Sequence, residues 1–139
     1  MPKPEKPALA DEFSEQGLDA FTRYWYAAYN YLVETGDPNL LQSVTQQSCA
    51  RCNNVIADTS AWYNGGGWRI GDLLTPTSIR VTFTSVYQAL VQYNKSDGTF
   101  IRPDGQVEKN YPATVADVDV FNATYLENKW LVSNVGKAG

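Results

Sequence analysis

The sequence predicts an α+β fold in which three N-terminal helices pack on one face of a strongly bent, mostly antiparallel sheet. Apolar residues recur every three or four positions up to residue 63, and every second position after the glycine run at residues 65–67. The expected strands follow one another without intervening helices, which disfavours a parallel sheet. The chain has 139 residues, enough for one domain with a sizeable core.

The first helix is expected over residues 15–35. Ser14 is a favourable N-cap, and Gly36 suits the left-handed position that follows a last helical turn. One apolar stripe has helical spacing and consists of Leu18, Phe21, Trp25, Ala28, Tyr29 and Leu32. A second stripe, which includes Tyr24 and Tyr31, borders it, so more than half of the circumference is apolar or aromatic. Either a curved sheet wraps this helix, or a ligand or a second subunit covers its tyrosine flank.

The remaining elements are two further helices, the first of them short, and a series of strands. The helices are expected over residues 38–44 and 48–63, and the strands over 68–74, 79–84, 87–93, 114–126 and 130–135. The alternation changes phase at Ser85-Val86, which predicts a β-bulge or a bend within one long strand. Turn sequences lie at residues 97–98 and 103–105.

The two ends divide the chain into a tether, a domain and a tail. Residues 1–12 contain three prolines and no apolar run, so they are expected to form a flexible, extended tether rather than a signal peptide or a strand. Residues 13–135 form the single domain, and residues 136–139 form a tail. Two interpretations of the tether remain open: a cytosolic protein with a frayed start, or an exported domain whose signal lies outside this chain.

The composition excludes several classes of function. The sequence has no histidine, which removes Ser-His-Asp and Cys-His catalysis and histidine-based zinc or haem sites. Its net charge of −4 disfavours binding to nucleic acid, since phosphate contacts need clustered Lys and Arg. We therefore expect no cofactor, no metal and no nucleic-acid partner.

Cys49 and Cys52 are the only two cysteines. Two thiolates without histidine cannot complete a four-ligand zinc site within one chain. A thiol-redox pair is possible, but such pairs normally follow a strand, and both flanks here look helical. A structural disulfide that closes one helical turn is the preferred interpretation. It would require an oxidising compartment, in agreement with export.

Several motifs, taken in order, support a resemblance to known families. The three helices, the glycine break and a final hairpin at residues 128–132 resemble nuclear transport factor 2-like and ketosteroid-isomerase-like proteins, which have a cone fold. The proline-rich start, the aromatic run at 24–31, the Thr-Gly-Asp-Pro step at 35–38 and the Cys-x-x-Cys at 49–52 together resemble an uncharacterised family of actinobacterial lipoprotein-type domains. That resemblance covers about residues 13–135 and implies a location at the cell surface.

Cone folds often form a pocket between the first helix and the sheet, and their enzymes use an Asp or His base there with Tyr or Asp donors. The resemblance places the following residues in such a pocket: Tyr24, Tyr31, Trp62, Tyr63, Trp68, Asp117 and Asp119. Asp117 and Asp119 share one face of a strand and could act as an acid–base pair if burial raised one pKa. The preferred interpretation is a solvated face, because Ala116, Val118 and Val120 make the better core set. Tyr24 and Tyr31 could equally be core or interface residues.

The first functional hypothesis is a non-catalytic, extracytoplasmic domain that a missing N-terminal lipid anchor tethers to the membrane. It would bind a small apolar or envelope-derived ligand, or a protein partner, through an aromatic cleft beside the first helix. Alternatives are a histidine-free isomerase or dehydratase that uses the Asp and Tyr residues, and a thiol-redox role for the cysteine pair. The sequence allows a monomer or a homodimer.

Overall fold

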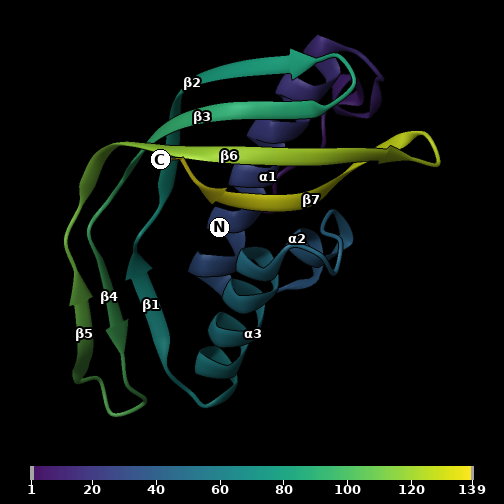
Figure 1. The fold of residues 1–139 in the computed structure, drawn as a ribbon. Coiled ribbons are helices and arrows are strands. Elements are labelled where there is room, and N and C mark those ends of the chain that lie inside the picture. The colour runs from purple at the N-terminus through teal and green to yellow at the C-terminus, as the bar shows by residue number, and fades with distance from the viewer. Residues whose placement is uncertain (1, 139) are drawn as a thin grey trace.

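A computed structural model describes residues 2–138 and contains three α-helices and seven strands in that range (Figure 1). The helices are α1 (Glu15–Thr35), α2 (Asn39–Ser43) and α3 (Ala50–Asn64), preceded by a 3₁₀ turn, η1 (Ala8–Asp11). The strands are β1 (Trp68–Gly71), β2 (Leu74–Phe83), β3 (Tyr87–Lys95), β4 (Gly98–Ile101), β5 (Val107–Tyr111), β6 (Thr114–Leu126) and β7 (Lys129–Lys137).

The strands form two antiparallel sheets, one with the order β2-β3-β6-β7 and one with the order β1-β4-β5. Three stretches of chain, β1–β2, β3–β4 and β5–β6, each supply one strand to each sheet, and each changes direction at a two-residue connection. In the first of them, Gly71 and Asp72 have φ values of 73° and 61°. The predicted α+β fold, with helices against a bent antiparallel sheet, is confirmed.

Helix α1 has the predicted ends and packs against the four-stranded sheet (Figure 1). The Ser14 hydroxyl accepts a hydrogen bond from the Gly17 amide at 2.9 Å, and Gly36 adopts the left-handed conformation with φ 79°. Five residues of the predicted core stripe are fully buried: Leu18, Phe21, Trp25, Ala28 and Leu32. The helical period in the sequence therefore identified the correct face of this helix.

The change of phase at Ser85-Val86 is a chain reversal, so the prediction of a bulge within one strand was wrong. Phe83 of β2 lies opposite Tyr87 of β3, and three residues connect them. A three-residue loop ends one alternation and starts another on the neighbouring strand, which leaves the same signature as a bulge. Strand β5 was missed because its residues Val107–Asn110 are all exposed and carry no alternation.

The packed part of the chain begins before residue 13 and extends beyond residue 135. Ala10 is fully buried, the Tyr125 hydroxyl donates to the Asp11 carbonyl at 2.7 Å, and the Trp130 indole donates to the Glu12 carbonyl at 2.8 Å. At the other end, β7 continues to Lys137. Tertiary hydrogen bonds thus hold residues 11 and 12 of the expected tether, and β7 includes residues 136 and 137 of the expected tail. Among the described residues, no helix is long and apolar enough to cross a bilayer.

Candidate functional site

Asp119 lies in the interior, and the core face predicted for β6 was wrong. Asp119 and Phe121 are fully buried, whereas Val118 and Val120 are half-buried. Ala116, at the start of the strand, has φ 56° and is exposed. Alternation cannot distinguish the two faces when a buried carboxylate finds partners on distant elements.

Three elements meet at Asp119. The Tyr26 hydroxyl, from α1, donates to Oδ2 at 2.7 Å, and the Arg51 guanidinium, from α3, donates to Oδ1 at 2.7 Å. The Tyr93 hydroxyl, from β3, donates to Oδ1 at 3.3 Å and accepts from Lys137 Nζ at 2.9 Å. We call these five residues the Asp119 cluster. Since each oxygen of the buried carboxylate is engaged, the cluster joins α1, α3 and the sheet.

The protonation states of the cluster follow from burial and pairing. Burial raises the pKa of Tyr26 far above its ordinary value of 10.0, and the charge of Asp119 raises it further. Burial lowers the pKa of Arg51, but the hydrogen bond and charge of Asp119 outweigh this effect, so the net direction is upward. At neutral pH, therefore, Tyr26 is a neutral donor and Arg51 a permanent cation.

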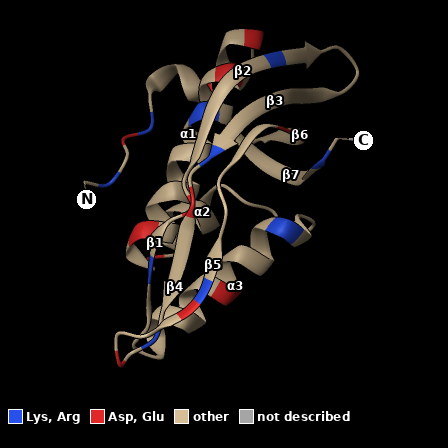
Figure 2. Cartoon of the chain, turned by 90° about the vertical axis from the view of Figure 1, so that its left-hand side faces the viewer, with Lys and Arg blue, Asp and Glu red and all other residues tan. Residues whose placement is uncertain are grey.

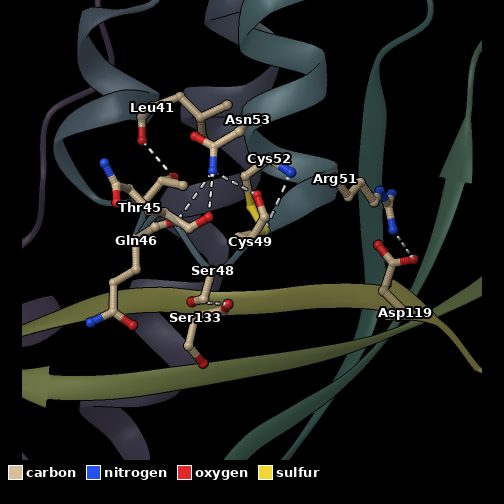
Figure 3. Close-up of a disulfide and its surroundings, with 11 residues drawn as sticks. Leu41, Thr45, Gln46, Ser48, Cys49, Arg51, Cys52, Asn53, Asp119 and Ser133 are labelled. Atoms are coloured by element: carbon tan, nitrogen blue, oxygen red, sulfur yellow. Dashed lines mark hydrogen bonds and ion pairs between the residues drawn. A yellow bond between two sulfur atoms is a disulfide. The ribbon is translucent and has the colours of Figure 1, made fainter.

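A disulfide joins Cys49 to Cys52 at the start of α3 (Figure 3). Both cysteines are buried, and Asn53 Nδ2 donates to the Cys49 carbonyl at 2.9 Å. Arg51 lies between the two cysteines in sequence and extends from this turn to Asp119 (Figure 3). The bond fits a location outside the reducing cytoplasm.

An open groove of about 770 Å³ lies between the N-terminal segment, α1 and β2. Most of its lining is apolar and comes from Pro4, Pro7, Leu9, Ala20, Ala27, Ile79 and Val81. Tyr24 lines it, is 7% exposed and, among the described residues, makes no side-chain hydrogen bond. Burial, followed by the charge of Asp11, raises the Tyr24 pKa. A smaller groove of about 290 Å³ shares Arg23 and Ala27 with the first and extends to Asn30.

Of the seven residues predicted to line a pocket, Tyr24 alone lines either of the two grooves described above. Tyr24 lines the groove and Asp119 lies in the interior, while Tyr31 is half-buried beside the core. Asp117 is half-buried, with Lys137 Nζ at 3.8 Å from its carboxylate.

The other three predicted residues lie where α3 meets β1. The Trp62 indole donates to the Trp68 carbonyl at 3.0 Å. The Tyr63 hydroxyl donates to the Val33 carbonyl at 2.7 Å. The Trp68 side chain itself is 38% exposed. Trp62 thus connects α3 to β1, and Tyr63 connects α3 to the last turn of α1. Neither residue lines the groove.

Sequence reasoning missed Tyr26, Arg51 and Tyr93 as partners of Asp119. Arg51 and Asp119 are 68 residues apart, and no spacing rule connects them. One sequence signal could have drawn attention to Arg51: it is a charged residue between two cysteines that were expected to form a disulfide.

Comparisons with known proteins support the fold and the family. The intermembrane space region of the chloroplast protein ARC6 is similar, with a TM-score of 0.56 at 9% identity, over 91% of this chain and 97% of that one. The Kfla4162 protein from Kribbella flavida is similar, with a TM-score of 0.57 at 13% identity, over 90% of this chain and 92% of that one. No curated protein matches the chain. A family model described as "Family of unknown function (DUF6318)" matches residues 1–136, and the chain belongs to this family.

Proposed function

We propose that this protein is a non-catalytic binding domain that takes an apolar ligand or partner segment in the groove between its N-terminal segment, α1 and β2. The observation that carries this proposal is the groove itself: about 770 Å³, mostly apolar, with the Tyr24 side chain in its wall. Volumes of this order are typical of ligand sites, in which a few polar groups within an apolar lining orient the ligand.

The location proposed is outside the cytoplasm, in a lipoprotein-type domain of the nuclear transport factor 2-like class. The Cys49–Cys52 disulfide supports an oxidising compartment. Three prolines within residues 2–7 support an extended connection from an N-terminal anchor to the domain. The bent sheet against α1 supports the cone-fold class.

Filling the groove tests the proposal. Ala27 lines both grooves, so Ala27→Trp should weaken binding of the neutral fluorophore N-phenyl-1-naphthylamine about tenfold or more, by steric exclusion. Ala57→Trp, at an exposed position on α3, is the matched control and should bind as the parent does. Equal binding by both variants, or none by the parent, would contradict the proposal.

One contact favours a second candidate, a histidine-free isomerase or dehydratase. The Tyr26 hydroxyl lies 2.7 Å from Asp119, and Tyr26 also lines the smaller groove. An isomerase would convert a β,γ-unsaturated ketone to its conjugated isomer, which absorbance detects. Loss of turnover in Asp119→Asn but not in Asp117→Asn would support this candidate, and no conversion by the parent would remove it.

A further inference from the structure

We infer that the occupant of the groove is an extended peptide that pairs with the free edge of β2 as an additional strand. This inference rests on the proposed function, since it uses the same groove and specifies the class of ligand. β2 is the outermost strand of the four-stranded sheet, and among the described strands it pairs with β3 alone. Figure 1 shows it along the upper border of that sheet.

An edge strand presents unpaired backbone groups to its surroundings. In an antiparallel pair only alternate residues bond to the neighbouring strand, and the other N–H and C=O groups point outward. Between Ser78 and Phe83, no bond from β2 to any described backbone other than β3 is formed. The groove is bounded by this stretch, at Ile79–Val81. A peptide strand supplies the complementary donors and acceptors, which a purely apolar molecule lacks.

Asn30 already shows how this edge accepts a partner. Its side-chain amide donates from Nδ2 to the Leu74 carbonyl at 2.8 Å and accepts at Oδ1 from the Leu74 amide at 2.9 Å. A neighbouring strand makes this same two-bond pair with an edge residue. The Leu74 groups therefore point away from β3, and Asn30 closes the edge at the end of the smaller groove. Pro76 has no N–H, so the receptive stretch begins after it.

The dimensions of the two grooves suit a short strand. Together they follow α1 from Glu15 to Asn30, about 23 Å at 1.5 Å per residue. They follow β2 from Leu74 to Val81, about 23 Å at 3.3 Å per residue. About seven extended residues therefore fit, with alternate side chains against the apolar lining at Ala20 and Ala27.

The charges of the groove indicate the sign of the peptide. Asp19 is paired with Arg23 at 2.8 Å, whereas none of the ion pairs between described residues involves the other charged lining residues, Glu5, Glu15 and Arg80, whose charges of −1, −1 and +1 sum to −1. Both of these carboxylates line the groove, and Figure 2 shows the N-terminal segment with its charged residues running beside α1. We therefore expect alternating apolar residues with a Lys or Arg toward this acidic end.

The test separates strand pairing from apolar binding. A positional-scanning library of acetylated, amidated heptapeptides identifies the best sequence by fluorescence polarisation. That peptide is then compared with an analogue N-methylated at alternate amides, which keeps the side chains and removes donors from one edge. The expected result is about tenfold or more weaker binding by the analogue, with slowed amide exchange in the peptide-bound protein at residues 78–83.

Two variants and two further measurements complete the test. The double variant Glu5→Gln/Glu15→Gln should weaken the selected peptide and lower its salt dependence, whereas Glu127→Gln, on the β6–β7 turn, should change neither. Binding of the apolar fluorophore without selection of any peptide, or equal binding of peptide and analogue, would overturn this inference and leave the proposed function standing. Concentration-dependent dimerisation that protects residues 78–83 would overturn it in favour of a second copy of the chain. Failure of both probes would overturn the proposed function as well.

Discussion

At the scale of single residues, Asp117 and Asp119 show how different two positions on one strand face can be. Asp119 is fully buried and accepts hydrogen bonds from Tyr26, Tyr93 and Arg51. Asp117 is half-buried, accepts a hydrogen bond from Thr114, and has a distant lysine partner. The sequence pattern places the two aspartates on the same strand face. Only the residues packed around them make Asp119 a buried carboxylate and leave Asp117 partly exposed.

Asp119→Asn should lower the free energy of unfolding by about 2–4 kcal/mol. The substitution leaves the half-buried Arg51 cation without its counter-charge, and breaking one partner of a buried pair is strongly destabilising. Asp117→Asn should cost less than about 1 kcal/mol, since its ion pair is exposed and long. Denaturant titrations of both variants measure the difference, and equal costs would contradict the role assigned to the cluster.

Stability should decline above pH 10 through the buried tyrosines. The pKa of Tyr26 is raised in the folded state, mainly by burial and then by Asp119, so its contribution is fully present below its ordinary value of 10.0. It is lost as the pH rises from 10 toward the raised pKa, by about 1.4 kcal/mol per pH unit. Tyr26→Phe should reduce that slope, as denaturant titrations between pH 9 and 11.5 would show. An unchanged slope would mean that this hydroxyl ionises as easily in the folded protein as in the unfolded chain.

At the scale of elements, the end of α1 depends on its contact with α3. Gly36 has a positive φ, and a Cβ atom there would collide with the ring of Tyr63, near the end of α3. The Tyr63 hydroxyl in turn donates to the Val33 carbonyl in the last turn of α1. The helix end is therefore fitted to its neighbour as well as to its own backbone.

Gly36→Ala should destabilise the protein by about 2–4 kcal/mol, from backbone strain together with overpacking against Tyr63. Gly105→Ala is the matched control, because Gly105 also has a positive φ of 86° but has open space where the Cβ would lie. It should cost only about 1 kcal/mol, from the backbone alone. Thermal or denaturant unfolding compares the two, and equal losses would show that the ring moves away freely.

At the scale of the whole molecule, the two sheets differ in how they are covered. The four-stranded sheet packs on α1, and its inner residues Val91, Phe121 and Val132 are fully buried. In the three-stranded sheet, β5 pairs with β4 alone among the described strands, and Val107–Asn110 are exposed. The larger sheet therefore contributes to the hydrophobic core, whereas β5, at the edge of the smaller sheet, is largely exposed.

Amides of β5 should exchange with deuterium much faster than those of β3 and β6. Local opening requires little free energy where few apolar contacts hold a strand, whereas central strands open only with the whole fold. Hydrogen–deuterium exchange followed by mass spectrometry would resolve Val107–Tyr111 from Tyr87–Lys95. Equal protection of the two segments from exchange would indicate that another surface, such as a second copy of the chain, covers β5.

The sequence by itself determined the elements whose signals are local. The period of α1, its Ser14 cap, its Gly36 end and the long strand at residues 114–126 were all readable, because capping and periodicity depend on neighbours within a few positions. The cysteine spacing likewise indicated the disulfide, because three residues of separation can close one helical turn.

Tertiary structure alone decided the buried cluster at Asp119 and the groove beside α1. Asp119 is buried and fully hydrogen-bonded because three elements distant in sequence bring partners to it: α1 brings Tyr26, α3 brings Arg51 and β3 brings Tyr93. Tyr24 came to line a groove because the N-terminal segment and β2 lie on either side of α1. A side chain's solvation is set by everything that packs around it, so no local pattern could assign these roles.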